Sequence, residues 1–391
     1  MHVLLVPSWY PTREAPLDGI YFAEQARCLD RHGLTVGVVY PEQQSLRRLS
    51  WDALQHSHFQ TEWHREDGLP TLRRHGWNVW WRCPPGLRLR VRTAVRLARR
   101  YVNRHGVPDL VHAQSGRWAG AAAARIGTHY DIPSVLTEHF SGLLRDAVFP
   151  WRWPLLREAY REARAVSAVS TPLRQAIAAH GLAPASRVSL LPNLAPPAFF
   201  PSCGLDRPAP PPFRFVTIAR LNPSKNVGGL LTAFAAVCES SPTETTLTVV
   251  GDGAERGPLE QKTRRLGIEG QVRFLGRLER DAVRNVLRHA HAFVLPSLHE
   301  TFGVVLLEAM ATGLPVVATA SGGPEDLVTP ETGLLVPPGD PDALADALST
   351  LRDDRPSYDA DVIRAYVRDQ FGPEAFVRRT RALYRRALNT S

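Results

Sequence analysis

The sequence predicts an α/β protein made of two doubly wound domains, each with a parallel sheet covered by helices on both faces. Three observations lead to this prediction. The chain has 391 residues, which is too long for one ordinary core and suits two domains of roughly 100–200 residues. Apolar runs of strand length alternate with helical patterns from end to end. A proline cluster at residues 192–212 separates the halves, where neither a helix nor a central strand can continue.

The first half starts with a strand at once and then alternates strands with helices. Its strands are near-continuous runs of Val, Leu and Ile, which is typical of parallel strands buried on both faces. The predicted strands are residues 2–8, 34–40, 69–74, 109–114, 133–139, 165–170 and 187–192. The predicted helices include residues 19–32, 87–104 and 118–129.

The second half repeats this rhythm. The predicted strands are residues 213–220, 246–251, 272–276, 292–296, 315–319 and 333–336. The predicted helices are residues 227–239, 255–266, 280–289, 304–312 and 343–351, followed by two tail helices over 359–388 that break near Gly372 and Pro373. We expect an N-terminal domain at 1–197, a Pro-rich linker at 198–212, a second domain at 213–358 and C-terminal helices at 359–391. Ligands bind at the carboxyl ends of the strands in such folds.

The composition excludes several classes of protein. With 44% hydrophobic and 22% charged residues and a mean hydropathy of −0.20, the chain is not expected to be disordered. It has no run of about 18 apolar residues and no signal-peptide pattern, so we expect neither a transmembrane helix nor secretion. The four cysteines are scattered without a CxxC motif, which favours a reducing cytoplasmic setting.

The positive charge lies almost entirely in the first half. Residues 1–197 hold 25 Arg and no Lys against 15 acidic residues, whereas residues 198–391 hold 20 Arg and 2 Lys against 23. All nine tryptophans lie within residues 1–153. This asymmetry favours an anionic partner for the first half. The alternative is Arg-rich codon usage with solvated charges.

The strongest motif is residues 297–313, SLHETFGVVLLEAMATG. It follows an apolar strand and enters an apolar helix through Gly303, and such a helix start offers free N–H groups and a positive dipole end to a phosphate. Glu300 lies in the loop. Glu308 lies in the helix, where a carboxylate can accept two hydrogen bonds from a vicinal diol. A solvated Glu308 is the alternative, but its apolar neighbours require a partner for the charge.

The second motif is residues 219–226, ARLNPSKN, at the end of the first strand of the second domain. Arg220 and Lys225 can clamp a diphosphate there. The chain has only two lysines, Lys225 and Lys262, so a lysine at this place indicates a need for a compact ammonium. A basic turn that caps a helix is the alternative.

Together these two segments resemble the retaining glycosyltransferases of family 4. The two glutamates of that family match Glu300 and Glu308, and its basic pair matches Arg220 and Lys225. Further matches follow in order at residues 250–253, 274–276, 313–318, 321–325 and 332–336. The first half is similar, through residues 7–11 and 19–25, to a subgroup that builds bacterial polysaccharides, although the usual Gly-Gly is Asp18-Gly19 here. The common His-x-His appears as His112-Ala113-Gln114.

The resemblance implies the GT-B fold: two Rossmann-like domains that face each other across a cleft, with C-terminal helices that cross back to the first domain. The N-terminal domain would bind the acceptor and the C-terminal domain the nucleotide sugar. It also implies retaining transfer of a sugar from a nucleotide-diphosphate sugar to a saccharide or a polyprenyl-diphosphate-linked acceptor, without a cofactor or a metal. Arg220 and Lys225 would neutralise the leaving diphosphate, and Glu300 and His139 would contact the sugar. Glu308 would hold the ribose. The further donor-binding residues would be Gly303, Phe302, Val304, Arg277 and Gly19.

Other readings remain open at this point. A nucleotide-sugar epimerase or a phosphorylase would keep the fold and change the reaction. The basic, Trp-rich first half also suits a nucleic-acid-binding protein, but it carries no recognition motif, so we expect no nucleic-acid partner.

The helix at residues 87–104 adds a hypothesis about membranes. It has an apolar stripe (Leu87, Val91, Val95, Ala98, Val102), a basic face (Arg88, Arg92, Arg96, Arg99, Arg100) and nearby tryptophans (Trp77, Trp80, Trp81). Such a helix can lie on an anionic membrane, here the inner face of the cytoplasmic membrane. The alternative is that the stripe packs on the sheet.

Overall fold

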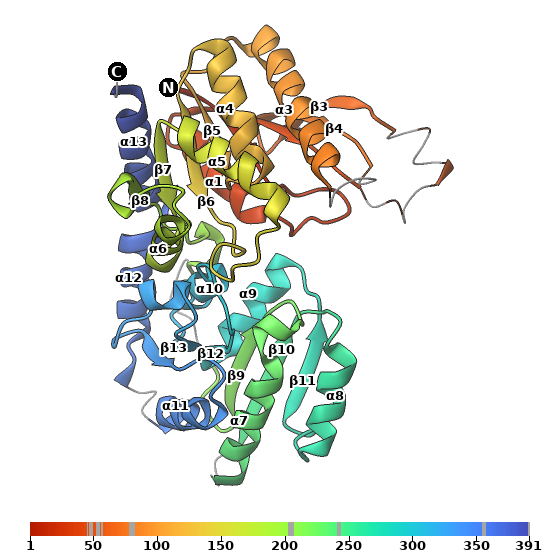
Figure 1. The fold of residues 1–391 in the computed structure, drawn as a ribbon. Coiled ribbons are helices and arrows are strands. Elements are labelled where there is room, and N and C mark those ends of the chain that lie inside the picture. Colours follow the sequence, from red (N-terminus) through yellow and green to blue (C-terminus); the bar gives the residue numbers. More distant parts are fainter. Residues whose placement is uncertain are drawn as a thin grey trace. The chain divides into compact units, whose positions relative to one another are not determined.

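A computed structural model describes residues 1–44, 46, 50, 51, 55, 58–77, 83–201, 207–240, 244–353 and 357–389. The chain divides into two compact units, Met1–Leu194 with Phe376–Ser391 and Ala195–Ala375. Each unit is an α/β domain with one sheet, as the ribbon of each shows (Figure 1). The prediction of two doubly wound α/β domains is therefore confirmed.

The first unit contains, within its described residues, an eight-stranded sheet in the order β3-β4-β2-β1-β5-β6-β7-β8. All neighbouring strands run parallel except β3 and β4. Their bounds are β1 His2–Pro7, β2 Thr35–Pro41, β3 Thr61–Glu66, β4 Leu69–Arg74, β5 Leu110–Gln114, β6 Ser134–Glu138, β7 Ala165–Ala168 and β8 Val188–Leu190. The central strands β1, β5 and β6 are buried on both faces, which explains the continuous apolar run of β1; β5 and β6 also bury polar side chains such as those of His112, Thr137 and Glu138.

Helices cover both faces of this sheet (Figure 1). Their bounds are α1 Ile20–Arg31, α3 Pro84–His105, α4 Trp118–Tyr130, α5 Trp153–Glu162, α6 Thr171–Ala179 and α13 Pro373–Asn389. The helix α13 completes the first unit although it ends the chain: Tyr384 is fully buried, and its hydroxyl lies 2.8 Å from Nδ1 of His112 on β5.

The structure resolves the two readings of the apolar stripe on α3. The buried face of α3 is Gly86, Val91, Ala94, Leu97, Ala98 and Tyr101. The expected stripe is thus partly wrong, because Leu87, Val95 and Val102 are only half-buried. The buried face packs on β2, β4 and α4, so it is not available to a membrane. The arginines at 88, 92, 96, 99 and 100 are exposed. Trp80 and Trp81 lie outside the described residues.

The second unit contains, where the chain is described, a six-stranded parallel sheet in the order β11-β10-β9-β12-β13-β14. Its strands are β9 Phe213–Ile218, β10 Thr245–Val250, β11 Val272–Gly276, β12 Ala292–Leu295, β13 Val316–Thr319 and β14 Gly333–Val336. Its helices are α7 Val227–Ser240, α8 Arg256–Arg265, α9 Arg280–His289, α10 Val304–Ala311, α11 Pro341–Asp353 and α12 Ala360–Phe371. Phe213, Phe215, Leu231 and Phe234 belong to its core.

The strand order has a switch point in each unit. From β9 the chain proceeds outward through β10 to β11 and then returns to β12 on the other side of β9. In the first unit the same reversal lies between β1 and β5. Open α/β sheets bind ligands at the carboxyl ends of the strands beside such a switch point.

No helix in the described part of the chain is both long enough and apolar enough to span a membrane.

Candidate functional site

The switch point of the second unit brings the two sequence motifs together. The loop after β9 ends in a short 3₁₀ helix, Pro223–Lys225. The side chain of Asn222 caps this helix by accepting hydrogen bonds from the backbone N–H of Ser224 at 3.1 Å and from its hydroxyl at 2.7 Å, with Pro223 in the first turn. This local structure directs Lys225 toward the loop after β12, where its Nζ forms an ion pair with Oε2 of Glu300.

The backbone of Glu300 is fixed from its other side. Its N–H donates to the carbonyl of Ser321 at 2.9 Å, and its carbonyl accepts from the N–H of Gly323 at 2.8 Å. A Cβ on Gly323 would lie 2.2 Å from Cα of Phe302, so only glycine permits this close approach. The Ser-Gly-Gly-Pro-Glu motif at 321–325 therefore holds the Glu300 loop in place.

Glu308 lies on α10 and is only 8% exposed. Its charge is compensated by Arg280, the first residue of α9, whose Nη1 donates to Oε1 at 2.6 Å. The guanidinium of Arg280 also stacks 4.8 Å from the ring centroid of Phe199, which limits its movement. A buried carboxylate needs such a partner, and the structure supplies it from a neighbouring helix rather than from solvent.

The residues that begin α10 lie where the sequence places them. Gly303 precedes the helix with φ of 93°, a left-handed conformation that favours glycine. Val304 is the first helical residue, and its N–H is among those that a helix start leaves without an intrahelical acceptor. Phe302 is 2% exposed and packs against Phe371, so its side chain belongs to the core of the unit.

Arg220 and Arg277 are both exposed. Backbone hydrogen bonds hold the residues on either side of Arg220: the N–H of Ala219 donates to Val250 at 3.0 Å, and that of Leu221 donates to Asp252 at 3.0 Å. The loop of Arg220 is thus fixed while its side chain reaches solvent. Arg277 follows β11 directly, three residues before Arg280, which pairs with Glu308.

Gly19 lies directly before α1 in the first unit, with φ of 73°. A Cβ at this place would lie 2.7 Å from the backbone carbon of Trp9. Gly19 therefore packs the start of α1 against the loop that follows β1. This contact accounts for the glycine without any ligand.

His139 follows β6 and is buried against the rings of Tyr21 and Phe22. Burial lowers the pKa of its imidazole to about 3, so the ring is neutral at ordinary pH. Its Nε2 has no hydrogen-bond partner among the described residues. A buried nitrogen without a partner is costly, and this makes His139 a candidate for contact with a ligand.

Glu138, which the sequence analysis did not select, organises the surroundings of His139. It is fully buried. Its carboxylate accepts from the backbone N–H of Gly116, His139 and Phe140 at 3.0, 2.9 and 3.0 Å. It also accepts from the hydroxyls of Ser115 at 3.0 Å and Tyr160 at 2.7 Å. One carboxylate thereby joins the loops after β5 and β6, so Glu138 is a positioning residue.

Two family models match this chain in succession. A model described as "Glycosyltransferase Family 4" matches residues 19–198, and one described as "Glycosyl transferases group 1" matches residues 207–368. The boundary between the two matches lies close to the boundary between the two structural units.

Individual proteins show the same likeness. The chain is 30% identical over 275 residues to a glycogen synthase of Mycobacterium tuberculosis, which covers 68% of the chain and 65% of that enzyme. The chain thus spans about two thirds of the length of that curated relative. Among solved structures, sucrose-phosphate synthase from Thermosynechococcus elongatus has a TM-score of 0.77 at 22% identity over 100% of both chains. Anabaena HepE in complex with UDP and glucose has a TM-score of 0.68 at 21% identity over 98% of both chains.

Proposed function

Since this chain belongs to the GT-B glycosyltransferases of the family 4 type, we propose that it transfers a sugar from a nucleoside-diphosphate sugar to a saccharide or lipid-linked saccharide, with retention at the anomeric carbon. The donor is supported by a structural neighbour with UDP and glucose bound and by the donor motifs of the second unit. The acceptor class comes from the resemblance of the first half to enzymes that build bacterial polysaccharides.

The observation that carries the proposal is the convergence of Lys225 and Glu300 at the β9–β12 switch point. The cation can bind the diphosphate of a nucleotide-sugar donor there, and the carboxylate can bind the hydroxyls of its sugar. When the sugar–phosphate bond breaks, charge develops on the diphosphate, and Lys225, Arg220 and the N–H groups at the start of α10 would stabilise it. Glu300, released from Lys225 by the incoming diphosphate, would orient the hydroxyls of the sugar.

The remaining roles follow from burial and pairing. Glu308 would accept hydrogen bonds from the ribose diol, while Arg280 holds its other oxygen. We keep His139 as a contact for the donor sugar because its Nε2 is buried and unpaired within the described chain. In the proposed same-face step, the bond from C1 to the phosphate oxygen breaks as the bond from C1 to the acceptor oxygen forms. The proton of the acceptor hydroxyl passes to the leaving phosphate, so no protein nucleophile is needed.

A lipid-linked acceptor would place the enzyme at the inner face of the cytoplasmic membrane. The exposed arginines of α3 support this part of the proposal, because basic residues are attracted to anionic headgroups. Since the apolar face of α3 is buried, the contact would be electrostatic and peripheral.

The test combines a ligand screen with matched variants. Thermal shift against UDP, GDP, ADP and dTDP, and then their sugars, should identify one stabilising donor. With that donor, Arg220→Ala and Lys225→Ala should each lower kcat by roughly 10²-fold or more, as loss of transition-state charge stabilisation does. Lys262→Ala on α8, which removes the only other lysine, is the control and should leave kcat unchanged. The assay is run in EDTA because the proposal requires no metal.

Three results would contradict the proposal. If none of the nucleotides stabilises the protein, the proposed donor site in the second unit is wrong. If Lys225→Ala turns over like Lys262→Ala, the diphosphate is bound elsewhere. Interconversion of two nucleotide sugars without an acceptor would favour an epimerase.

A further inference from the structure

Two arginines of the first unit are held among aromatic rings without an ion pair. Arg117 follows β5, and its Cζ lies 5.1 Å from the ring centroids of both Trp9 and Phe140. Arg90 lies on α3, and its Cζ lies 4.4 Å from the ring centroid of Trp118, the residue after Arg117. Neither guanidinium forms an ion pair with a carboxylate in the described parts of the chain.

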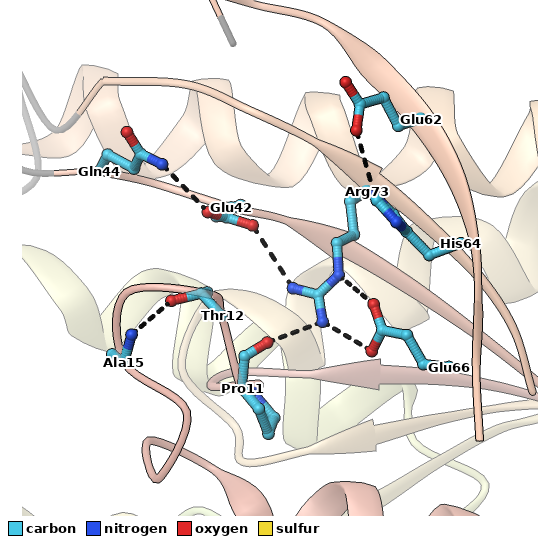
Figure 2. A network of polar contacts seen from close by, with 9 residues as sticks. All are labelled: Pro11, Thr12, Ala15, Glu42, Gln44, Glu62, His64, Glu66 and Arg73. Atoms are coloured by element: carbon cyan, nitrogen blue, oxygen red, sulfur yellow. Dashed lines mark hydrogen bonds and ion pairs between the residues drawn. The ribbon is translucent and has the colours of Figure 1, made fainter. Parts of the chain in front are cut away.

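Arg73 of the same unit shows how an arginine in similar surroundings is balanced by the protein itself (Figure 2). Its Cζ lies 5.2 Å from the ring centroid of Tyr10, and it lines a cavity of about 700 Å³ beside β3 and β4. Its Nε and Nη2 donate to the two carboxylate oxygens of Glu66 at 2.5 and 2.8 Å, and Nη2 also donates to the carbonyl of Pro11 at 2.7 Å. The two arginines described above have the aromatic rings but no such carboxylate.

The place of Arg117 is unfavourable for a cation. It directly precedes α4, whose start has no side-chain cap and carries the positive end of the helix dipole. Burial lowers the pKa of its guanidinium to about 10, and the charges of Arg152 and Arg90 act in the same direction. Glu138 acts in the opposite direction, but its carboxylate already accepts from five other donors. A guanidinium in this place costs free energy unless an anion binds to it.

The loop that presents Arg117 is fixed in advance. Ser115 has a φ of 83°, which is a strained conformation for a residue other than glycine. Its hydroxyl and the N–H of Gly116 both donate to Glu138 at 3.0 Å, and its N–H donates to the carbonyl of Thr137 at 2.7 Å. Strained backbone that its surroundings hold in place is found at ligand sites, and it orders Arg117 before a ligand arrives.

A second, independent feature lies at the same edge of the sheet. Three polar atoms, each at the carboxyl end of a different strand, are buried and have no hydrogen-bond partner within the described residues: Oγ of Ser8, Oε1 of Gln114 and Nε2 of His139. Ser8 and His139 directly precede the two residues whose rings contact Arg117. Because buried polar atoms are nearly always paired, these three indicate that hydroxyl groups of a ligand bind beside Arg117.

The charge of the cluster selects the kind of anion. Arg90 and Arg117 together carry two positive charges, and each presents a planar fork of N–H donors. A carboxylate has one negative charge, which a single fork satisfies. A phosphate ester has about −1.5 to −2 charges at neutral pH and three free oxygens, so it matches both guanidinium groups. Sugar hydroxyls next to the phosphate would pair the three buried polar atoms.

We propose that Arg117, supported by the charge of Arg90, binds a phosphate group of the acceptor, so that the acceptor is a phosphorylated saccharide. This rests on the proposed function and deepens it, because it adds a charge requirement to the acceptor. His139, which the proposed function assigns to the donor sugar, directly precedes Phe140, and the ring of Phe140 contacts Arg117. The phosphate therefore lies close to the hydroxyl that receives the sugar.

The experiment is isothermal titration of the full chain, saturated with the nucleoside diphosphate that the screen identifies so that the donor site is occupied. The probe is α-glucose 1-phosphate; methyl α-glucoside and glucuronic acid are the comparisons. We expect the phosphate to bind about tenfold or more tightly than either comparison, as charged hydrogen bonds imply. Arg117→Gln should weaken it by about tenfold or more for the same reason, while Arg161→Gln, an exposed arginine on α5, should have no effect.

The melting temperature separates a binding role from a structural one. Without phosphate, Arg117→Gln should melt no lower than the wild type, because it removes an unfavourable charge, and glucose 1-phosphate should no longer raise its Tm. Arg73→Gln is the matched comparison. It breaks the pair with Glu66 and should melt at a lower temperature than the wild type.

A further arm identifies the source of the phosphate. The decyl diphosphate ester of α-glucose is titrated beside glucose 1-phosphate. Tighter binding of the ester would assign the phosphate to a lipid-linked acceptor, and equal or weaker binding would assign it to a water-soluble sugar phosphate. Both results support a phosphate site at Arg117.

Four outcomes would overturn the inference. They are no detectable binding of glucose 1-phosphate, equal binding of the neutral glucoside, equal binding of glucuronic acid, or binding that Arg117→Gln does not weaken. Lys225→Ala is titrated without nucleotide in parallel and should still bind glucose 1-phosphate. Failure of the nucleotide to bind would therefore refute the proposed function, whereas a protein that binds its nucleotide and not glucose 1-phosphate refutes only this inference.

Discussion

Glu308 shows how one residue can be both structural and available to a ligand. Arg280 donates to Oε1 at 2.6 Å, so the carboxylate is held in place before any donor arrives. A preorganised acceptor binds a diol without the cost of ordering its side chain. The apolar neighbours of Glu308 on α10 further restrict its rotation.

We expect Glu308→Ala to weaken donor binding by about 2–3 kcal/mol, the usual value of hydrogen bonds to a charged acceptor. A 2′,3′-dideoxy donor lacks the diol, so its binding should not respond to the change. Titration of both donors against wild type and variant measures this difference. Equal losses for both donors would show that Glu308 does not bind the ribose.

Two buried histidines in the first unit should make its stability depend on pH. Burial lowers the pKa of His112 and His139 to about 3, whereas in the unfolded chain the value is about 6.5. Below pH 6.5 the unfolded state therefore binds protons that the native state does not, and stability falls as the pH decreases. The loss can reach about 1.4 kcal/mol per pH unit for each histidine.

Urea unfolding followed by tryptophan fluorescence measures this effect, because all nine tryptophans lie within residues 1–153 and report on the first unit. The free energy of unfolding should be lower at pH 5 than at pH 7. In His139→Phe, which keeps an aromatic ring beside Phe22, the difference should be smaller than in the wild type, while His112 and the other histidines with a lowered pKa, such as His75, still contribute. An unchanged difference would place the pH dependence elsewhere.

At the scale of elements, α3 carries an apolar face and a basic face, and the structure assigns them to different surroundings. Its buried face packs on the sheet and α4, while Arg88, Arg92, Arg96 and Arg99 remain exposed. We expect the four Arg→Gln changes together to weaken binding to vesicles that contain anionic lipid. Each charge near the membrane surface should contribute about 1 kcal/mol to the binding free energy.

Cosedimentation with vesicles at low and high salt checks this prediction, since the attraction is screened within a Debye length. Thermal stability should stay nearly unchanged, because none of the four side chains is buried. If the wild-type protein does not cosediment with anionic vesicles at low salt, the prediction of membrane association is wrong, and the transferase proposal is unaffected.

The elements themselves were predictable because most strands are buried on both faces. Predicted and observed bounds agree at 272–276 for β11 and at 280–289 for α9. The strand β3 escaped prediction because it is an edge strand: Thr-Glu-Trp-His-Arg-Glu has no fully buried residue and therefore no apolar period. The cavity depends on β3 and could not be predicted without it.

Candidate site residues could be proposed from the sequence where a motif is continuous, as for Glu300 and Lys225, which the structure brings together. Partners from distant segments could not. Arg280 pairs with Glu308 across 28 positions, and the sequence indicated only that the charge of Glu308 needs a partner. Glu138 was overlooked because its five donors come from the loops after β5 and β6 and from α5, and no local pattern reveals that they converge.

At the scale of the whole molecule, the first unit needs α13 to complete its core. It follows the second unit in sequence but packs in the first, where Phe376, Leu383 and Tyr384 are buried. Burial of each such side chain contributes about 1.5–3 kcal/mol, and their sum is comparable with the entire stability of a domain, about 5–15 kcal/mol.

We expect a chain that ends at Ala375 to lose the native state of the first unit and to keep that of the second. Tryptophan emission should shift to the red, while the second unit still binds the nucleotide found by the screen. The milder variant Tyr384→Phe should cost the first unit about 1–3 kcal/mol, because Nδ1 of His112 loses its partner. Native tryptophan emission from the truncated chain would show that α13 is dispensable.

Because α13 follows the second unit in sequence, the first unit can complete its fold only after the second unit has been synthesised. A ribosome adds about 5–20 residues per second, so the segment 195–375 takes roughly 10–35 seconds to make. For that time the sheet of the first unit exists without the helix that covers it, and His112 has no hydroxyl beside Nδ1. A nascent chain halted after residue 375 is therefore expected to hold a chaperone on its first unit, and one extended past residue 389 to let it go. A helix made after the second unit thus closes the unit made before it.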